Sequence, residues 1–401
     1  MRILIVADWH AVRGGSERYV HWLRESLVAE GHHARLFTGG ASASETGAEY
    51  AGFAPKALAA RAFTQLFNPF ALASLHAALR DFRPDAVLLC GFLDHLSPAI
   101  LALLRGIPTV LSVHDYKLIC PVAQKLLPDE AICAYRAGSV CWTKGCVGLL
   151  HWLRDQPRYG AVRVGTGSID RVVACSEWLR RVLAEQGIAS EALLIPVPPP
   201  SPSFRRQPAA EPRFLFLGRL SREKGVHTLL GAFHRVRREH PTATLRLAGE
   251  GAERGALVRL SSELGLGEAV VFTGWLEPSA VEAELARAWA LVAPSVWAEP
   301  MGLVTVEANV RRVPVIASET GGFAETIEPG AGGLLVPNGD VDALASAMLK
   351  VATGRAFGDL ILPEAVARRT AARHDLGQHT RKLVEILQGA REPAPRLGVP
   401  R

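Results

Sequence analysis

The sequence lacks any uninterrupted apolar run that is long enough to cross a bilayer. The apolar stretch over residues 86–113 is broken by charged residues, a histidine and prolines, at Asp94, His95, Pro98, Arg105 and Pro108. The N-terminal residues MRILIVADWH form too short an apolar run, and become acidic too soon, to be a secretory signal peptide. We therefore expect the protein to stay in the cytoplasm.

Long basic tracts are also missing, although the net charge is +6. A positive charge suits polyanionic ligands or an anionic membrane surface. The Lys and Arg residues are dispersed, and no basic stripe interleaved with aromatic residues is present, such as nucleic-acid binding proteins use. We expect no nucleic-acid partner.

The cysteine pattern lacks a C-x2-C pair. Four of the six cysteines, Cys120, Cys133, Cys141 and Cys146, fall in one irregular stretch with the spacing C-x12-C-x7-C-x4-C. Cytosolic cysteines are generally reduced, so we expect no disulfide framework. Four thiols in a loop could hold a structural zinc ion, but the spacing favours a loop with buried thiols and no metal.

The chain opens with a pattern that predicts a parallel βαβ unit. Residues 2–7 form a compact β-branched and leucine-rich run, Gly14 and Gly15 follow in a loop, and an amphipathic helix is expected over residues 16–30 before a strand near 34–38. The glycine spacing is not G-x-G-x-x-G, which disfavours a plain dinucleotide-binding oxidoreductase. A tight turn is the alternative explanation for the two glycines.

A proline-rich connector divides the chain. With 401 residues, of which 49% are hydrophobic, the sequence is long enough for two or three globular domains. Six prolines between residues 196 and 208 favour extended, semi-rigid geometry. We place the domain boundary there, giving domains over residues 1–195 and 196–361, with a last helix over about 362–387.

His114 follows the predicted strand at residues 109–113. Ligands of open α/β sheets collect at the carboxyl ends of strands, which makes this a favoured position for a functional side chain. We expect Asp115 to give local hydrogen-bonding support. A structural role for His114 is the alternative.

The second half begins with a strand at residues 213–217, a loop GRLSREKG and a helix over about 226–239. Arg219 and Lys224 lie in this loop between glycines, where arginine suits bidentate contact with phosphate and lysine supplies a point charge. The alternative is an ordinary solvated basic loop.

Residues 294–309, PSVWAEPMGLVTVEAN, carry Glu299 and Glu307. A strand over 288–293 feeds this stretch, and a helix is expected to begin near Gly302 or Leu303. Free N–H groups at such a helix start form an anion site that suits a diphosphate, and the two acids can bracket it. Two acids on a solvated helix are the alternative.

Two further stretches have competing explanations. Residues 56–83 predict a basic, aromatic, amphipathic helix pair broken at Asn68-Pro69, which either faces the core or lies on a membrane or a lipid-linked ligand. Asp340-Val341-Asp342 resembles a metal-binding D-x-D motif, but it follows Asn338-Gly339 and opens a helical run. We therefore expect Asp340 to cap a helix and expect no catalytic divalent ion.

Five ordered motifs resemble those of retaining glycosyltransferases of family 4. They are Gly14-Gly15, His114-Asp115, Arg219 with Lys224, Gly249-Glu250-Gly251, and Glu299 with Glu307. The resemblance covers almost the whole chain and implies the α/β GT-B fold, in which two Rossmann-like domains with parallel sheets face each other across a cleft. It also implies that the last helix, about 362–401 with the tail, packs back on the first, acceptor-side domain.

The resemblance further implies a donor, an acceptor and residue roles. The donor is a nucleotide diphosphate sugar, most often with UDP or GDP, and the acceptor is a glycan, a lipid-linked molecule or a small molecule. Arg219 and Lys224 would clamp the diphosphate, His114 and Glu299 would hold the transferred sugar, and Glu307 would hold the ribose. The remaining donor-binding positions would be Gly14, Gly15, Gly249, Glu250, Trp275, Leu276, Met301, Gly302 and Leu303.

The same resemblance implies no cofactor and no catalytic metal, and allows peripheral contact with the inner membrane face. One departure concerns the cysteines, because relatives with a cysteine-rich insert have a C-x2-C whose second cysteine would fall at Arg136. Two other functions stay open, a sugar-nucleotide epimerase of similar fold that needs no acceptor, and a non-catalytic protein that only binds the nucleotide sugar.

Overall fold

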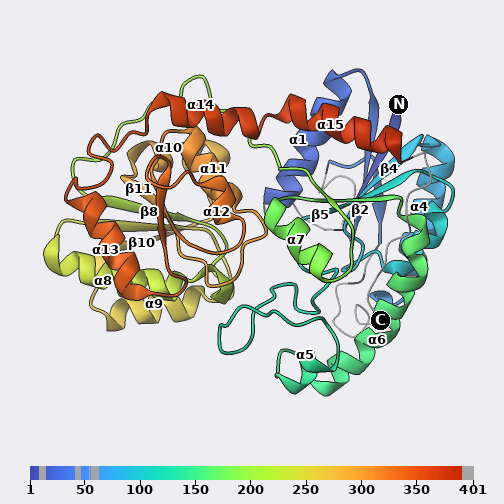
Figure 1. Cartoon of the computed structure of the whole chain (residues 1–401), viewed down its shortest axis with the longest axis horizontal. Coiled ribbons are helices and arrows are strands. Elements are labelled where there is room, and N and C mark those ends of the chain that lie inside the picture. Colours follow the sequence, from blue (N-terminus) through green and yellow to red (C-terminus); the bar gives the residue numbers. More distant parts are fainter. Residues whose placement is uncertain (9–14, 41–46, 54, 56–62, 391–401) are drawn as a thin grey trace. The chain divides into compact units, whose positions relative to one another are not determined.

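The computed structural model describes residues 1–8, 15–40, 47–53, 55 and 63–390. The chain divides into two compact units. The first comprises Met1–Asp129, Cys133–Pro196 and Leu376–Arg401, and the second comprises Glu130–Ile132 and Val197–Asp375. Each unit is an α/β body built on its own sheet (Figure 1).

The first unit contains a seven-stranded sheet in the order β3-β2-β1-β4-β5-β6-β7. Every neighbouring pair in this sheet is parallel, and in the opening unit Ile3 pairs with Ala34 on one side and Ala86 on the other. The strands are β1 (Arg2–Ala7), β2 (His33–Gly39), β3 (Tyr50–Gly52), β4 (Ala86–Cys90), β5 (Thr109–Val113), β6 (Arg171–Ala174) and β7 (Glu191–Ala192). Its helices are α1 (Gly15–Ala29), α4 (Pro69–Phe82), α5 (Ser139–Thr143), α6 (Leu149–Gly165), α7 (Glu177–Glu185) and α15 (Leu376–Gly389), with short 3-10 turns η1 (Pro98–Leu104) and η2 (Thr166–Ser168).

The second unit contains a six-stranded parallel sheet in the order β10-β9-β8-β11-β12-β13. Its strands are β8 (Arg213–Leu217), β9 (Thr244–Ala248), β10 (Val270–Gly274), β11 (Ala290–Ala293), β12 (Val315–Ser318) and β13 (Gly333–Val336). Its helices are α8 (Val226–Glu239), α9 (Arg254–Glu263), α10 (Pro278–Arg287), α11 (Leu303–Val310), α12 (Phe323–Thr326), α13 (Val341–Ala352) and α14 (Glu364–Arg373), with 3-10 turns η3 (Arg222–Lys224) and η4 (Gly267–Ala269).

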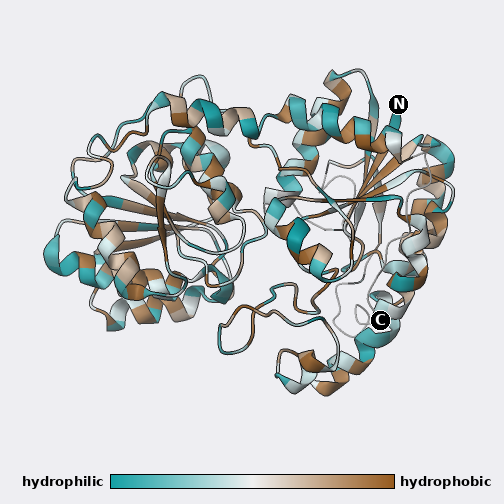
Figure 2. Ribbon diagram, in the orientation of Figure 1, coloured by the Kyte–Doolittle hydropathy of each residue, from teal (hydrophilic) through white to brown (hydrophobic). Residues whose placement is uncertain are grey.

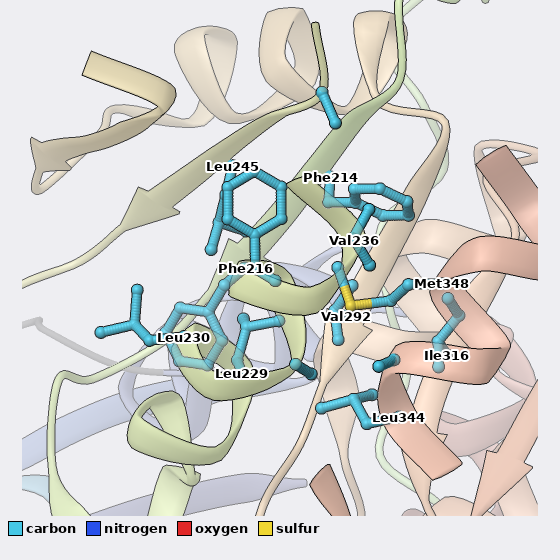
Figure 3. Packing of buried hydrophobic residues seen from close by; sticks show 14 of the residues in the cluster. Phe214, Phe216, Leu229, Leu230, Val236, Leu245, Val292, Ile316, Leu344 and Met348 are labelled. Atoms are coloured by element: carbon cyan, nitrogen blue, oxygen red, sulfur yellow. The ribbon is translucent and has the colours of Figure 1, made fainter. Parts of the chain in front are cut away.

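Both faces of the second sheet are buried, and alternate residues of each strand enter different cores. Phe214 and Phe216 of β8 join one cluster with side chains of α8 and α13, whereas Leu215 and Leu217 join the other. Figure 3 shows the first cluster, in which Phe216 lies near Leu229 and Leu230. Full burial of each such side chain contributes about 1.5–3 kcal/mol. The period of two along β8 therefore fixes the helices on both sides of the sheet.

The C-terminal part of the chain forms two helices, and the expectation of one helix over 362–387 is wrong. Helix α14 ends at Arg373 and α15 begins at Leu376. The backbone of His374 accepts from Val197 N within the second unit, at 3.2 Å. Asp375 and Leu376 mark the change of unit, so only α15 belongs to the first.

Helix α15 lies beside α1 and is tied to it by polar contacts (Figure 1). The Tyr19 hydroxyl lies 2.8 Å from His379 Nε2, and the Ser26 and Thr380 hydroxyls are also 2.8 Å apart. His379 Nδ1 lies 2.8 Å from the Leu194 carbonyl oxygen. The His379 imidazole therefore has a partner on each nitrogen, as buried polar groups generally do. These contacts hold α15 in one register on the first unit.

Two helices begin with a side-chain cap. Helix α4 begins at Pro69, and the Asn68 side chain accepts from Ala71 N at 3.1 Å, so the predicted break at Asn68-Pro69 is confirmed. Asp340 caps α13 by accepting from Ala343 N at 2.9 Å, as expected. Residues 56–62 of the expected helix pair lie outside the described residues. Within the described ranges no helix is both long and apolar enough to span a membrane.

Candidate active site

The centre of the candidate site in the second unit is the contact between Lys224 and Glu299. Lys224 Nζ donates to Glu299 Oε1 at 2.5 Å, and the Ser295 hydroxyl donates to the same oxygen at 2.7 Å. The ammonium also lies 5.2 Å from the centre of the Trp297 ring. The structure thus brings together one basic and one acidic residue that are 75 positions apart in the sequence.

The Glu299 carboxyl is buried, which by itself raises its pKa. The charge of Lys224 and hydrogen bonds from Lys224, Ser295 and Trp297 outweigh that effect and hold the pKa below its usual value. Glu299 is therefore ionised at neutral pH. An ionised carboxylate of this kind can accept hydrogen bonds from hydroxyl groups.

Helix α11 begins four residues after Glu299. The helix begins at Leu303 after Gly302, and Met301 is buried just before it, which confirms the helix start expected from sequence. Glu307 lies at the fifth residue of α11 and is half-buried. The backbone oxygen of Glu299 accepts from Gly322 N at 2.7 Å, which fixes the loop that leads into the helix.

Arg219 contacts a different acid, Glu223. Its Nη2 lies 3.3 Å from Glu223 Oε1, and the Arg219 side chain remains 67% exposed. The buried Glu223 also accepts from the Ser221 hydroxyl at 2.7 Å, and its carbonyl oxygen accepts from Val296 N at 2.9 Å. Glu223 was not singled out from the sequence, although it stands inside the GRLSREKG loop. It positions Arg219 and joins the Lys224 loop to the Glu299 loop.

The loops after β8, β9 and β10 are joined through their backbones. Leu220 N donates to Glu250 O at 2.9 Å, and Gly249 N donates to Gly274 O at 2.9 Å. Gly249 has φ +142°, and a Cβ there would lie 1.8 Å from Gly218 O. Glycine is therefore required where these loops approach each other.

The remaining expected positions of the second unit lie at the same strand ends. Glu250 is exposed and pairs weakly with Arg254 at 3.8 Å. The Trp275 ring is half exposed after β10, whereas Leu276 packs against the second core cluster. In the first unit Gly15 begins α1, and Gly14 lies outside the described residues.

A cavity of about 170 Å³ lies at the carboxyl ends of β1, β4 and β5 in the first unit, and His114 lines it. His114 Nε2 is 2.7 Å from the Ser112 hydroxyl, and its ring meets the edge of Tyr19 at 5.2 Å. Desolvation, followed by the charge of His379, lowers the pKa of His114 to about 4. The imidazole is therefore neutral at pH 7 and can both donate and accept a hydrogen bond.

Asp8, Asp94 and Lys117 line the same cavity and were not identified from the sequence. The Asp8 carboxylate accepts from the backbone N–H groups of His95 at 2.7 Å and Leu96 at 3.1 Å, and also from that of Asp94. Lys117 Nζ donates to Asp94. Desolvation and the charge of Asp94 raise the pKa of Asp8 to about 7, against the opposing effects of the backbone hydrogen bonds and Lys117.

The cysteines are all free; Cys120, Cys133 and Cys146 lie in irregular backbone as expected, whereas Cys141 lies in helix α5 and not in a loop. Cys120 and Cys141 are buried, while Cys133 and Cys146 are half-buried. Desolvation raises the pKa of the Cys141 and Cys146 thiols, so both are protonated at neutral pH. Across residues 1–8, 15–40, 47–53, 55 and 63–390, no group of three or more His, Cys, Asp or Glu is arranged to hold a metal ion.

Family models match both halves of the chain. The model for a glycosyl transferase 4-like domain matches residues 14–200, and the model for glycosyl transferases group 1 matches residues 202–372. The two matches together span nearly the whole sequence.

Two curated relatives match about half of the chain. The glycogen synthase of Mycobacterium tuberculosis is 35% identical over 210 residues, covering 49% of this chain and 49% of that protein. The GDP-mannose-dependent alpha-(1-6)-phosphatidylinositol monomannoside mannosyltransferase of Mycolicibacterium smegmatis is 34% identical over 198 residues, covering 45% and 49%. The chain therefore spans about half the length of these relatives.

Solved structures agree with the fold over almost the whole length. The sucrose-phosphate synthase of Thermosynechococcus elongatus has a TM-score of 0.73 at 21% identity, covering 97% of this chain and 99% of that one. HepE of Anabaena, solved in complex with UDP, has a TM-score of 0.69 at 18% identity, covering 97% and 100%. These likenesses show the expected two-sheet GT-B fold, and the two family matches show that the chain belongs to the family 4 glycosyltransferases.

Proposed function

We propose that the protein moves a sugar from a nucleotide diphosphate sugar to an acceptor hydroxyl with retention of the anomeric configuration. The observation that carries this proposal is the Lys224–Glu299–Ser295 arrangement before the start of α11. It offers a cation, an ionised carboxylate and a helix N-terminus within one unit. A diphosphate linked to a polyhydroxylated sugar carries groups that complement all three.

The donor we propose is a UDP or GDP sugar. Two related proteins support this choice, because HepE was solved in complex with UDP and the mycolicibacterial mannosyltransferase is GDP-mannose-dependent. We assign the diphosphate to Lys224 and Arg219, the transferred sugar to Glu299, and the ribose to Glu307. The base would lie at the loops of Gly249-Glu250 and Trp275-Leu276, where backbone groups are available.

The chemistry follows from the charges that develop in the reaction. The bond between the anomeric carbon and the diphosphate oxygen breaks, the acceptor oxygen bonds to that carbon, and the departing phosphate oxygen takes the acceptor proton. The leaving diphosphate becomes more anionic while the sugar becomes cation-like, so fixed cations at the phosphate lower the barrier. Lys224 and Arg219 supply them. For these roles we propose that no divalent metal and no cofactor is required, which a chelator test of turnover addresses.

For His114 we propose hydrogen bonding to a hydroxyl of the transferred sugar. The neutral imidazole is suited to this role because it can donate from one nitrogen and accept at the other. This hydrogen bond to a hydroxyl does not require His114 to be protonated. The acceptor we propose is a glycan, a lipid-linked molecule or a small molecule, and the place of action is the cytoplasm, with peripheral contact at the inner membrane face.

The test is a thermal-shift panel with UDP, GDP, ADP, dTDP and CDP, with and without magnesium. It uses the wild type, Arg219→Ala and Glu307→Ala, because neither residue belongs to a core cluster. A ligand at a hundredfold excess over its Kd stabilises a protein by about 2.7 kcal/mol. We expect one nucleotide to stabilise the wild type without magnesium and to stabilise each variant less. A folded wild type that responds to no nucleotide would refute the donor site.

Turnover distinguishes the proposed transferase from the two other functions. The matching nucleotide sugar is incubated with the protein, alone and with a panel of glycan and lipid-linked acceptors, and products are followed by NMR. Product that needs an acceptor and keeps the donor's anomeric configuration supports the proposal. Conversion of the donor alone to an epimer would refute it, as would an inverted anomeric centre.

A further inference from the structure

Helix α6 of the first unit buries an ion pair and turns a row of apolar side chains to the solvent. The side chains that it buries are Val162 and the charged residues Asp155 and Arg158, which are 2% and 3% exposed and form an ion pair at 3.4 Å. Its outward positions carry Leu150, Leu153, Pro157, Ala161 and Val164, all exposed. These five residues recur at the spacing of one helical face. A helix facing water would show the opposite arrangement.

The exposed area continues from α6 onto α5. We call the exposed side chains of Trp142, Leu149, Leu150, Leu153 and Val164 the α5–α6 surface. Leu150 is 83% exposed and Val164 is 75% exposed, and Trp142 packs beside Trp152 with ring centres 6.2 Å apart. The Trp152 ring nitrogen donates to Gly138 O at 3.0 Å, which holds the two helices together. Figure 2 shows hydrophobic residues along α5 and the first turns of α6.

Positive charge is concentrated around this surface. Residues 131–165 contain five Lys or Arg and one Asp or Glu, a net charge of +4 in a chain whose total is +6. The single acid is Asp155, whose charge is enclosed between Arg154 and Arg158. Lys144 and Arg163 are exposed, and the Lys144 ammonium lies over the Tyr135 ring at 5.8 Å. The surface therefore combines aliphatic, aromatic and cationic groups.

We propose that the α5–α6 surface docks on a membrane rich in anionic phospholipids. Leucines and a tryptophan would enter the boundary between headgroups and acyl chains, while Lys144 and Arg163 would meet the phosphates. Charge complementarity favours an anionic membrane over an apolar protein partner, because the excess of basic residues around the surface matches the negative charge of the lipid headgroups. The proposal rests on the peripheral placement suggested above but not on the transferase reaction, and it uses residues outside the 56–83 stretch considered from the sequence.

Cosedimentation of the full chain with vesicles tests the proposal. Two vesicle types are used, phosphatidylcholine alone, and equal parts of phosphatidylcholine and phosphatidylglycerol. We expect binding to the anionic vesicles that weakens as NaCl is raised, and little binding to the neutral ones. Each basic residue at such a surface contributes roughly a fivefold increase in partitioning, so Lys144→Gln should lower binding by about that factor.

Variants on the α5–α6 surface are compared with a control variant elsewhere, to distinguish loss of this surface from the general effect of adding a negative charge. Leu150→Asp with Leu153→Asp should lower partitioning at least about tenfold, and Val164→Asp should lower it several-fold. Val28→Asp is the matched control, since Val28 of α1 is 54% exposed in the same unit and should leave partitioning unchanged. Nucleotide-induced thermal shifts, measured on all variants, should stay as in the wild type and show that each is folded.

Three outcomes would overturn the proposal. The first is absence of wild-type binding to anionic vesicles, and the second is equal binding by the wild type and the Leu150→Asp/Leu153→Asp variant. The third is a wild type that is dimeric by analytical ultracentrifugation and a double variant that is monomeric. That result would assign the surface to a second copy of the chain. None of these outcomes bears on the nucleotide site, so the two proposals fail separately.

Discussion

Replacing Lys224 by methionine tests the central contact of the candidate site. The Glu299 side chain is 8% exposed and that of Lys224 is 21% exposed, so the pair is largely shielded from solvent. Removing one partner of a buried ion pair typically costs about 3–5 kcal/mol, because the other charge stays buried without compensation. We expect the Lys224→Met variant to lose about that much stability at pH 8. For a unit of this size such a loss lowers Tm by roughly 10 °C.

The loss of stability in Lys224→Met should increase as pH rises. In the wild type the folded-state pKa of Glu299 is lowered, so its contribution to stability is present above the unfolded pKa and is lost as pH falls through the folded pKa. In Lys224→Met burial is no longer outweighed by the ammonium, and the pKa should rise above its unfolded value. The variant should then be most stable below that unfolded value and lose stability as pH rises. The difference from the wild type should therefore grow between pH 5 and pH 8.

Chemical denaturation at the two pH values measures this effect. The double variant Lys224→Met/Glu299→Gln should recover most of the loss, because glutamine keeps the acceptor for Ser295 without a charge. Lys382→Met is the matched control, since Lys382 pairs with Glu385 on the surface and is 57% exposed. It should change stability by less than about 1 kcal/mol. A loss in Lys224→Met that is the same at both pH values would refute the reasoning.

Four further predictions concern individual residues, and each is measured by denaturation unless stated otherwise. Gly249→Ala should destabilise the second unit and abolish nucleotide shifts, because its Cβ would meet Gly218 O at 1.8 Å, whereas Gly160→Ala in α6 has open space and should be neutral or stabilising. Asn68→Ala should cost more than the about 0.5–2 kcal/mol of a lost α4 cap, because the buried Asn68 amide also donates to Phe53 O and His95 O, and an unchanged stability would contradict these contacts. Asp155→Asn should destabilise by about 3–5 kcal/mol by leaving Arg158 buried without its ion pair, while Gln156→Asn, on an exposed position next to it, should cost less than about 1 kcal/mol. The His114 pKa of about 4 means that its NMR titration should lie well below pH 6, with its contribution to stability complete above the unfolded value near 6.5 and lost as pH falls toward 4; a midpoint near 6.5 would refute this.

Local sequence patterns were sufficient to predict much of the fold. The buried apolar run of β1 predicted a parallel strand, and the apolar run at residues 213–217 predicted the strand β8; the structure contains both. The cap at Asp340 and the helix break at Asn68-Pro69 could also be predicted, because both depend on residues that are close together in the sequence. The single helix expected over 362–387 was wrong because the apolar pattern continues across the change of unit at Asp375.

Long-range contacts explain what the sequence could not supply. Asp8 accepts from a backbone 86 to 88 positions away, so its burial and raised pKa depend on how β1 and β4 pair. Glu223 lies within the GRLSREKG motif, yet its contacts depend on Val296 in the loop after β11. For the same reason, the sequence could not show that Lys224 and Arg219 contact different acids. Both residues suit phosphate, but only the fold places one against Glu299 and the other against Glu223.

Helix α6 shows how the two kinds of information combine. Its sequence contains both an apolar and a charged face, and ordinary burial would place the apolar one inward. The structure instead buries the Asp155–Arg158 pair, although burying two charges is costly even when they are paired. It also leaves Leu150 and Val164 in contact with water. An arrangement that is unfavourable on both faces is understandable if the outward face has its own apolar environment, which is what docking on a membrane would provide.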